Sequence, residues 1–474
     1  MEDLIKDNKI AIVGGGLVGA ACACMLSRKG FKVDVLELRD DLRKFHASET
    51  SVGRSINLSL SVRGQATLRL LGLEDTVIQN HAIPMRARMI HDLDGTTHSI
   101  PYGKKGQCIY SVGRRYLLEL LLNQAESDPN VRILFCHKLI RAEIERGEVI
   151  CRSGGGEQKT LKGYRAILGC DGAFSKVRQD VIRRGRFYFE QKYIEHGYVE
   201  LHIPPKNGNF QMARNFLHIW PRGEFMMIAL PNQDCSYTVT LFMPFIKFEA
   251  LNSPTRILEF FYKYFPDSVQ FIGEESIVST LISVRARSLV SVKCSPYHIG
   301  GRTLLLGDAA HAMLPFYGQG MNCGFEDVLI LDDLLTAHGC DEPSTINFAK
   351  VFSAFSATRT EDAHAIVDLA SYNYIEMRDL VNSRMFQLRK KFDGLLHFLL
   401  PDLWVPLYTS VTFSRMGYAN CIANRRWQDK ILKRSGRLVT ILSVGTLLWF
   451  GVHWTLTHPE YMFTATSLIL HDRA

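Results

Sequence analysis

Apolar and polar positions at the start of the chain follow the pattern of a strand, a helix and a second strand. Residues 9–13 (KIAIV) are an apolar run, residues 20–29 carry apolar positions at helical spacing, and residues 31–36 (FKVDVL) form a second apolar run. Short apolar runs on either side of a helical segment are typical of buried parallel strands joined by a crossover helix. The pattern therefore predicts a βαβ unit.

Three glycines separate the first strand from the helix in the spacing G-x-G-x-x-G. Gly14 suits a tight turn, Gly16 lets the backbone approach a pyrophosphate at the helix N-terminus, and Gly19 lets helix and strand pack closely. Glu37 ends the second strand, where an acid accepts hydrogen bonds from ribose hydroxyls. The unit predicts a dinucleotide site, and a structural glycine-rich turn is the alternative.

Two later apolar runs end in an aspartate. The run over residues 165–172 reaches Asp171 and continues as D-G-x-x-S-x-x-R, and the run over 303–306 opens into Gly307 and Asp308. Taken separately, each could be a strand-end turn with a capping aspartate. Together with the N-terminal unit they are hard to explain as structural turns alone.

The middle of the chain changes to shorter strand-like runs. Between residues 197 and 244, the runs VELHI, FLHIW, FMMIAL and YTVTLFM are separated by PPKNG, PRG and PNQD. Such spacing predicts an antiparallel sheet, which we expect to roof the ligand and supply one wall of a substrate pocket. From residue 348 to 400 the pattern turns helical, and these helices should cover the other side.

The C-terminal end combines a basic stretch with an apolar one. Six basic residues and a single acid lie between Arg425 and Arg437, which accounts for more than half of the net charge of +8. Residues 438–456 then contain no Asp, Glu, Lys or Arg, which is about the length that crosses a bilayer as a helix. With Trp449 and Trp454 near one end, the pattern predicts a membrane anchor whose basic flank faces the cytosol. A buried or interfacial helix is the alternative.

Composition excludes several classes of protein. With 474 residues, 46% hydrophobic and 22% charged, the chain is globular and not disordered. The eleven cysteines never form C-x-x-C, so we expect no disulfide framework, no metal site and no redox-active cysteine pair. Because the excess positive charge is mostly local, it does not indicate nucleic acid. Met1 to Lys9 lacks the hydrophobic stretch of a signal peptide.

The three segments resemble the fingerprints of the single-component flavin aromatic hydroxylases, in the same order. The middle of the chain narrows the resemblance to the members that hydroxylate L-kynurenine, through 196–198 (HGY), 217–222 (LHIWPR), 315–322 and 372–378 (YNYIEMR). The similarity extends over nearly the whole chain. It implies NADPH-dependent hydroxylation of L-kynurenine to 3-hydroxy-L-kynurenine with O2 as co-substrate.

The resemblance also implies the fold. We expect an α/β protein with a Rossmann-like FAD-binding domain, an inserted antiparallel sheet as substrate domain, and a C-terminal helical region with a membrane anchor. The expected boundaries are 1–190 with 295–345 for the FAD-binding domain, 191–294 for the sheet, 346–424 for the covering helices and 425–474 for the basic flank and tail.

In this family FAD is tightly bound and NADPH visits transiently, which agrees with the lack of a second βαβ fingerprint in this sequence. Residues 154–156 (GGG) have no strand before them and no helix after them, so they predict a hairpin turn. Asp308 is implied to bind the ribityl chain, and the backbone N–H groups of Met321 and Asn322 to face the flavin pyrimidine. The implied FAD contacts are Gly14, Gly16, Val18, Gly19, Glu37, Arg39, Arg114, Leu139, Asp171, Asp308, Met321 and Asn322.

Substrate anchoring is predicted from the run MRARMIH. Arg86 and Arg88 alternate with apolar residues, so in one strand both would point to the same face, and either could pair with a carboxylate. The residues alone do not choose between them. The resemblance selects Arg88, joined by Tyr102, Asn373 and Tyr408, and leaves Arg86 as either a surface charge or a supporting residue.

No protein acid or base is expected to be catalytic. The resemblance assigns the attack on the aromatic ring to a flavin hydroperoxide, so His311, despite its place in GDAAHA, is interpreted as a structural hydrogen-bonding residue. The implied location is the mitochondrial outer membrane, with the catalytic domain in the cytosol.

Two alternatives remain open from sequence. A related FAD hydroxylase acting on a lipophilic or quinone-like ring would not need Arg88 to hold a carboxylate. A non-enzymatic carrier with a flavoprotein fold would keep the first glycine motif without a working flavin site. The intact segment 308–322 argues against the carrier.

Overall fold

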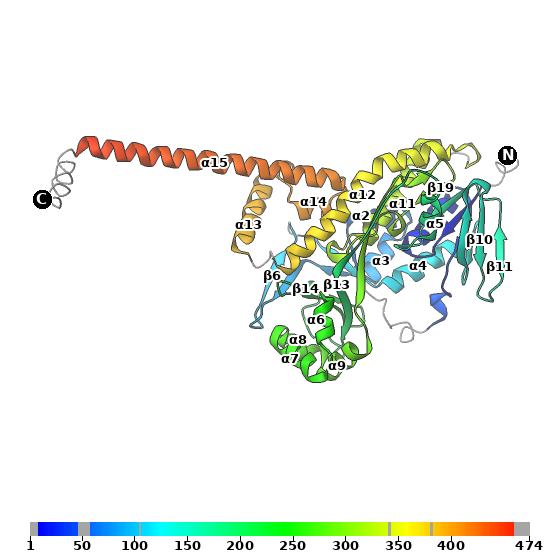
Figure 1. The fold of residues 1–474 in the computed structure, drawn as a ribbon, viewed down its shortest axis with the longest axis horizontal. Helices are drawn as coiled ribbons and strands as arrows, with labels where there is room; N and C mark the ends of the chain where they lie inside the picture. The colour runs from blue at the N-terminus through cyan, green and yellow to red at the C-terminus, as the bar shows by residue number, and fades with distance from the viewer. Residues whose placement is uncertain (1–7, 46–56, 104–105, 340–342, 380–382, 459–474) are drawn as a thin grey trace.

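The computed structural model describes residues 8–45, 57–103, 106–339, 343–379 and 383–458. These residues form a body of sheets and helices, from which one long helix extends (Figure 1). Met1 to Asp7 and residues 459–474, on which parts of the N-terminal and tail predictions fall, lie outside the described residues.

The βαβ prediction is confirmed. β1 pairs in parallel with β2 on one side and with β12 on the other. The full sheet has the order β18-β19-β12-β1-β2-β8, in which only β18 runs antiparallel to its neighbour. Its strands are β1 (Lys9–Val13), β2 (Lys32–Leu36), β8 (Val131–Leu134), β12 (Ala166–Gly169), β18 (His298–Ile299) and β19 (Thr303–Leu305).

Helices rich in small and apolar residues pack against this sheet. In α1, the residues from Gly19 to Ser27 are all buried, and the small side chains among them allow close contact with α4 and α11. The resulting core spans the whole parallel sheet. The helices of this part are α1 (Leu17–Arg28), α2 (Val62–Leu70), α3 (Glu74–Asn80), α4 (Arg114–Glu126), α5 (Lys176–Ile182), α10 (Asp308–His311) and α11 (Gly320–Ala337).

Two small sheets flank the parallel one. β3 (Leu58–Leu60), β7 (Ile109–Val112) and β4 (Ile83–Met85) form the first. The second is a meander of β9 (Lys138–Glu143), β10 (Glu148–Arg152) and β11 (Gln158–Leu161). The hairpin predicted at residues 154–156 is confirmed, because Ser153 N donates to Glu157 O between β10 and β11.

The inserted antiparallel sheet is also confirmed, but it is wider than predicted. Its order is β17-β13-β16-β15-β14-β5-β6, and the pair β14–β5 is parallel. β5 and β6 come from within segment 1–190, so this sheet draws on both sides of the expected boundary. The strands are β5 (Ala87–His91), β6 (Thr97–Pro101), β13 (Tyr188–Ile203), β14 (Phe216–Pro221), β15 (Met226–Pro231), β16 (Tyr237–Pro244) and β17 (Arg287–Ser295).

A group of four helices lies between β16 and β17, where only strands were predicted. They form a lobe on the side of the sheet away from α12 (Figure 1). Their apolar side chains share a separate core with one face of the sheet. They are α6 (Phe245–Ala250), α7 (Pro254–Tyr264), α8 (Pro266–Ile272) and α9 (Glu274–Ser283).

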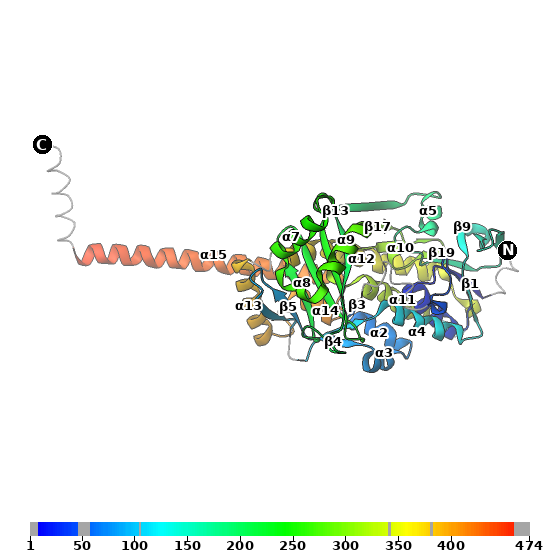
Figure 2. The same ribbon diagram turned by 90° about the horizontal axis from the view of Figure 1, so that it is seen from below.

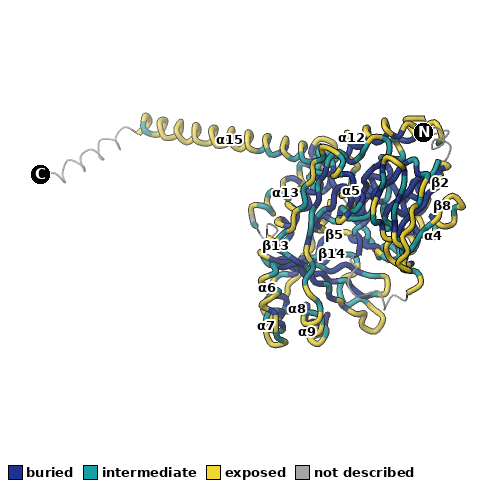
Figure 3. The backbone as a smooth tube through the Cα atoms, turned by 45° about the vertical axis from the view of Figure 1, so that its right-hand side comes forward, coloured by how far each residue is buried: buried dark blue, intermediate teal, exposed yellow. Residues whose placement is uncertain are grey.

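The C-terminal part is helical, as predicted. α12 (Phe348–Arg378) runs along the body, α13 (Arg384–Leu399) and α14 (Leu407–Phe413) follow, and α15 (Tyr418–Thr457) extends away from it. α15 is exposed along most of its length (Figure 3). It is the one helix of the described residues that is long and apolar enough to cross a membrane, and none of its apolar window is buried.

Candidate active site

The glycine loop after β1 has no space for a side chain at two of its glycines and has space at a third. Gly14 has φ +101°, and a Cβ built there would lie 2.4 Å from the Cys170 carbonyl oxygen. A Cβ on Gly19 would lie 1.9 Å from the Gly14 oxygen. A Cβ on Gly16, at the N-terminus of α1, would meet nothing within 4 Å. The loop therefore leaves space where a phosphate group would approach the backbone.

Glu37 holds this loop from the end of β2. Its Oε2 accepts a 2.8 Å hydrogen bond from Gly15 N, and its Oε1 accepts from Arg39 N and Nε at 3.0 and 2.7 Å. The backbone N–H of His137 donates to the Glu37 carbonyl, which brings the start of β9 beside this acid. Leu139, on β9, is buried in the core nearby.

Asp171 follows β12, and only one of its carboxylate oxygens accepts hydrogen bonds from the described residues. Oδ2 accepts from Lys176 N and Val177 N, at 2.6 and 3.1 Å, and so caps α5. Oδ1 is buried and has no partner among the described residues. Burial raises the pKa of Asp171, and the capping hydrogen bonds oppose this. A buried oxygen without a partner is costly, so Oδ1 is suited to accept a hydrogen bond from a ligand.

Asp308 begins α10 directly after β19. Its side chain is accessible to solvent, yet surrounding protein raises its pKa by burial, against the lowering effect of Arg114. Arg114 is the exposed first residue of α4. The structure thus brings two predicted cofactor residues from separate segments close enough to interact.

The side chain of Asn322 holds protein segments together and does not itself bind a ligand. Its side-chain amide donates to Ser59 O and Gly318 O at 2.7 Å each, and its Oδ1 accepts from Ser61 N at 2.9 Å. The side chain is fully engaged, so it ties the start of α2 to the start of α11. Only its backbone, with that of Met321, is left to face a cofactor at this helix N-terminus.

Val18 packs where the first and third segments meet. Its side chain lies against Gly307 and Gly324, where an added Cβ would come within 3.0 and 2.6 Å of Val18 Cγ2. The three fingerprint segments therefore meet around one glycine loop. The open position at Gly16, the unpartnered Asp171 oxygen and the acid Asp308 fit a dinucleotide of the FAD type.

Arg88 is the centre of a second cluster, beyond the parallel sheet. It lies on β5 and is 3% exposed, and its Nε and Nη1 are buried without a hydrogen-bond partner among the described residues. The nearest carboxylate oxygen is Oε1 of Glu376, 3.5 Å from Nη1. A buried guanidinium with free N–H groups is suited to receive an anionic ligand.

Aromatic rings surround this guanidinium. Its carbon lies 4.5 Å from the ring centre of Tyr408 and 5.9 Å from that of Tyr102. The rings of Tyr102 and Tyr408 are stacked 5.4 Å apart, and the Tyr317 ring is stacked with that of Tyr408 at 5.6 Å. The Tyr102 hydroxyl is buried without a partner, and burial raises its pKa. The cluster therefore offers flat apolar surfaces beside a positive charge.

Asn373 and Arg86 occupy different surroundings. Asn373, on α12, is 2% exposed and its amide nitrogen donates to Phe316 O at 2.7 Å. Arg86 is exposed and falls between β4 and β5, in neither strand. The expectation that Arg86 and Arg88 share one face of a strand is wrong, because the strand is interrupted at Arg86 and the exposed Arg86 does not share the buried surroundings of Arg88.

Comparison with known proteins shows the family to which the chain belongs. Residues 7–342 match the family model described as an FAD binding domain. The chain is 50% identical over 462 residues to "Kynurenine 3-monooxygenase" of Anopheles gambiae, covering 96% of this chain and 92% of that protein. It is 46% identical over 459 residues to the protein of that name from Sus scrofa, covering 96% and 94%. The chain belongs to the kynurenine 3-monooxygenase family. It is therefore an FAD-dependent flavoprotein monooxygenase.

Solved structures of other proteins share the fold of this kynurenine 3-monooxygenase family member. The tetrameric form of 2-methyl-3-hydroxypyridine-5-carboxylic acid oxygenase aligns with TM-score 0.63 and 21% identity, covering 79% of this chain and 93% of that one. P. aeruginosa PqsL in complex with 2-aminobenzoylacetate aligns with TM-score 0.62 and 19% identity, covering 78% and 96%. At such identities the likeness shows the fold alone.

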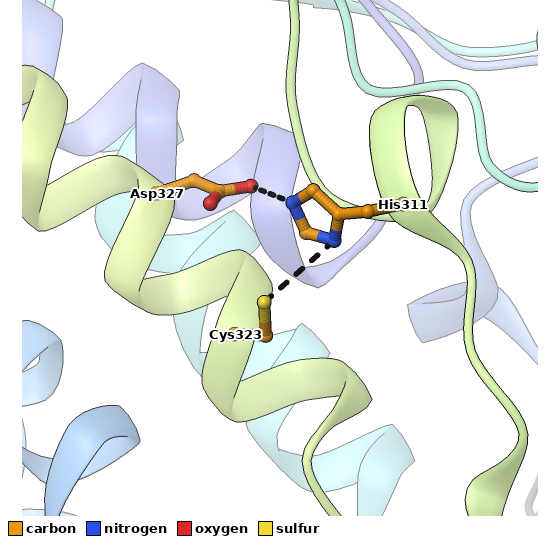
Figure 4. Close-up of side chains that lie close together, drawn as sticks. All are labelled: His311, Cys323 and Asp327. Atoms are coloured by element: carbon orange, nitrogen blue, oxygen red, sulfur yellow. Dashed lines mark hydrogen bonds and ion pairs between the residues drawn. The ribbon is translucent and has the colours of Figure 1, made fainter. Parts of the chain in front are cut away.

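His311 lies in a fully buried charged network of this kynurenine 3-monooxygenase family member. Its Nε2 is 2.6 Å from Oδ2 of Asp327, and its Nδ1 is 3.7 Å from the sulfur of Cys323 (Figure 4). These three side chains are close enough to one another to hold a metal ion. Arg359 already donates to Asp327 Oδ1 at 2.7 Å and to Cys323 Sγ at 3.0 Å. The Arg359 guanidinium thus lies within this group, and the structural role of His311 stays a prediction with which these hydrogen bonds agree.

Some residues of the Arg88 cluster were missed from sequence. Glu376 lies three residues after Asn373 on α12, so the helical spacing could have placed it on the same face. Tyr317 ends the PFY turn within a segment that was assigned to the cofactor alone. Lys390, whose Nζ is 2.9 Å from Glu376 Oε1, had no signal in the sequence.

Two large hollows open on the body, and neither contains a predicted site residue. One, of about 990 Å³, lies beside α12, β17 and the first turns of α15. The other, of about 880 Å³, lies between α4 and the β13–β16 part of the large sheet. The Arg88 cluster is instead closed and buried, as suits a reaction that must exclude water.

Proposed function

We propose that this chain hydroxylates L-kynurenine to 3-hydroxy-L-kynurenine, using FAD, NADPH and O2. The observation that carries the proposal is the buried Arg88, whose unpartnered N–H groups lie beside two stacked tyrosine rings. Kynurenine carries an α-carboxylate and an anilinic ring, which match these two features. Membership of a family whose relatives are named for this reaction supports the assignment.

The FAD would be held by the residues that meet at the glycine loop. Gly16 leaves room for the pyrophosphate, while Gly14 and Gly19 let the loop pack closely against its neighbours. Glu37, whose oxygens accept from Gly15 and Arg39, lies at the position expected for binding ribose hydroxyls. Asp308 would hydrogen-bond the ribityl chain. Val18, Arg39, Arg114, Leu139, Asp171, Met321 and Asn322 complete the proposed contacts. When bound, FAD supplies the oxygen activation that the protein side chains cannot.

The protein contributes binding, orientation and exclusion of water. Arg88 would pair with the α-carboxylate through its free N–H groups, and Tyr102 and Tyr408 would pack the anilinic ring. Asn373 would act chiefly through the backbone it holds at Phe316. The anilinic nitrogen already activates the ring carbon ortho to it, so no acid or base is required of the chain. NADPH would dock transiently, without a nucleotide-binding fold of its own.

We propose that α15 attaches the enzyme to the mitochondrial outer membrane, with the body in the cytosol. The support is its exposed apolar stretch, of which none is buried, behind a basic flank. Positively charged flanks favour the cytosolic side of a membrane.

The test is NADPH oxidation by the purified, yellow protein with L-kynurenine and with kynuramine, which lacks the carboxylate. We expect L-kynurenine to accelerate NADPH oxidation strongly and kynuramine to do so weakly, because only the first can pair with Arg88. Equal stimulation by both compounds would favour a hydroxylase of lipophilic rings. The absence of flavin absorbance in a folded preparation would contradict the whole proposal.

A further inference from the structure

Two cations share one carboxylate at the edge of the substrate cluster. Oε1 of Glu376 on α12 lies 2.9 Å from Nζ of Lys390 on α13 and 3.5 Å from Nη1 of Arg88. The shorter contact is a hydrogen bond, in which Lys390 donates. Nε and Nη1 of Arg88 are buried and have no hydrogen-bond partner among the described residues. The carboxylate therefore accepts from the lysine, and the arginine keeps N–H groups that a ligand can use.

Asp393, the one acid in the sequence of α13, is already bound by other cations. Its two oxygens accept from Arg389 and from Arg425 of α15, at 2.9 Å in each contact. Among the described residues, the ion pair of Lys390 is with Glu376 alone. α13 lies at the end of the body from which α15 leaves (Figures 1 and 2). Lys390 therefore connects this end of the body to the substrate cluster.

The charges of these three groups depend on one another. Burial and the charge of Arg88 lower the pKa of Lys390, and Glu376 opposes this effect. Burial acts to raise the pKa of Glu376, but Lys390 and Arg88 outweigh burial and hold that pKa below its usual value. Glu376 is therefore a carboxylate at neutral pH, and its hydrogen bond favours the charged form of Lys390. With both cations charged, one positive charge is left for the anionic group of a ligand.

We propose that Lys390 is a positioning residue for substrate recognition, which holds the Glu376 carboxylate so that Arg88 stays available for the substrate carboxylate. This role rests on the proposed function and adds a residue of α13 to it. Lys390 acts through Glu376 and does not itself touch the substrate.

Loss of the lysine charge would let Glu376 turn to Arg88. The two groups are 3.5 Å apart, so a small rotation of either side chain would bring them to hydrogen-bond distance. A guanidinium that is paired with a buried carboxylate offers fewer N–H groups to a ligand, because the ligand would have to displace that carboxylate. Substrate affinity should therefore fall, whereas the reaction at the flavin should keep its rate once the substrate is bound.

The test uses the full-length, FAD-loaded protein with Lys390→Met, which keeps a long side chain and removes its charge. Titration calorimetry with L-kynurenine gives Kd, and NADPH oxidation with L-kynurenine gives kcat. We expect Kd to rise about fivefold and kcat to stay within about twofold of the wild type. Lys390→Arg keeps the charge and should bind within about twofold of the wild type. Lys391→Met is the matched control, because Lys391 is the exposed next residue of α13, and its Kd should not change.

Lys390→Met in a Glu376→Gln background shows whether the lysine acts through this carboxylate. Without the carboxylate there is nothing for Lys390 to hold, so removal of the lysine should change Kd by less than about twofold. A rise of about fivefold in this background as well would overturn the positioning role, since Lys390 would then act on the substrate directly or on the fold.

Two further results would overturn this role. One is an unchanged Kd in Lys390→Met. The other is a raised Kd, or a loss of FAD or of kcat, that Lys390→Arg shares to the same extent, because the charge of residue 390 would then not matter. A wild-type protein that retains FAD and does not bind L-kynurenine would instead contradict the proposed function, and this role with it.

Discussion

Arg88 shows at the scale of one residue how burial creates specificity. A guanidinium that is 3% exposed and keeps two nitrogens without partners is unfavourable unless a ligand completes it. Glu376 offsets part of this cost at 3.5 Å but also serves Lys390. The cluster therefore keeps a positive charge for which the substrate carboxylate is the natural partner.

Replacing Arg88 should weaken substrate binding without loss of FAD. In Arg88→Ala, loss of a charge-assisted hydrogen bond of about 1.5–3 kcal/mol should raise KM for L-kynurenine roughly tenfold or more. Arg86→Ala is the matched control, because Arg86 is exposed and should leave KM unchanged. The measurement is the steady-state KM of both variants for L-kynurenine. An unchanged KM in Arg88→Ala, with an increase in Arg86→Ala, would move the anchor to Arg86.

The glycine loop makes contrasting predictions at two positions. In Gly16→Val the side chain enters open space, so the protein should fold but purify without its yellow colour. In Gly19→Val the Cβ would collide with the Gly14 carbonyl, so folding itself should fail. Circular dichroism and flavin absorbance separate the two effects. Stoichiometric FAD in Gly16→Val would refute the assignment of this loop.

At the scale of elements, a buried network holds the start of α10 against α11 and α12. Oδ2 of Asp327 accepts from Gly307 N at 2.8 Å and pairs with His311, while Arg359 of α12 binds its other oxygen. Because Gly307 directly precedes Asp308, this network fixes the turn that presents the proposed ribityl ligand.

The network predicts a pH dependence of stability. Burial acts to lower the pKa of His311, but Asp327 and Cys323 outweigh it and hold that pKa well above its usual value. A histidine whose pKa is higher in the folded protein than in the unfolded chain contributes its full stabilisation below the unfolded pKa of about 6.5. This contribution to the free energy of unfolding is lost as the pH rises through the folded pKa. The stability advantage of the wild type over His311→Gln, about 3–5 kcal/mol for a broken buried pair, should therefore be largest near pH 6 and shrink towards pH 9.

His218 supplies the control for this scan. Burial lowers the pKa of His218 to about 4, so its ring stays neutral in the folded protein between pH 6 and 9. The unfolded chain, in which the histidine pKa is about 6.5, takes up a proton at the low end of this range, so the Tm advantage of the wild type over His218→Gln should rise from pH 6 to about pH 7.5 and stay level above it, which is the opposite trend. A wild-type advantage over His311→Gln that does not shrink as the pH rises would show that the charge of His311 does not stabilise the network.

The elements also show what the sequence could and could not predict. The βαβ unit was predictable because its strands are continuous apolar runs and its glycines have fixed spacing. The parallel pairing of β14 with β5 was not, since it joins segments more than a hundred residues apart and leaves no local signal. Arg86 was misplaced because a break in a strand does not alter the alternation of residue types. Glu376 and Lys390 meet Arg88 only through the packing of α12 and α13.

At the scale of the whole molecule, the basic residues and the exposed apolar residues of α15 lie at one end of the protein. The exposed apolar stretch of α15 follows the basic residues between Arg425 and Arg437, and the helix extends away from the body (Figures 1 and 3). The glycine loop belongs to the part of the body away from that end. This arrangement predicts an enzyme attached by its helical end, with its cofactor domain held away from the membrane.

Removal of the apolar stretch should release the protein. Truncation after Arg437 should shift it to the soluble fraction, because the apolar side chains that drive insertion are lost. Replacing the basic residues between Arg425 and Arg437 with glutamine should only weaken attachment. Carbonate extraction of membranes is the measurement. Full-length protein that washes off at high pH would show that α15 is not inserted.

The central claim is tested most directly by the fate of molecular oxygen. Purified full-length protein is incubated with NADPH, L-kynurenine and 18O-labelled O2, and the product is analysed by mass spectrometry. The structure and its relatives predict 3-hydroxy-L-kynurenine with one labelled oxygen on the ring, in an amount that matches the NADPH consumed. NADPH oxidation that yields no hydroxylated kynurenine, from protein that retains FAD, would contradict the assignment.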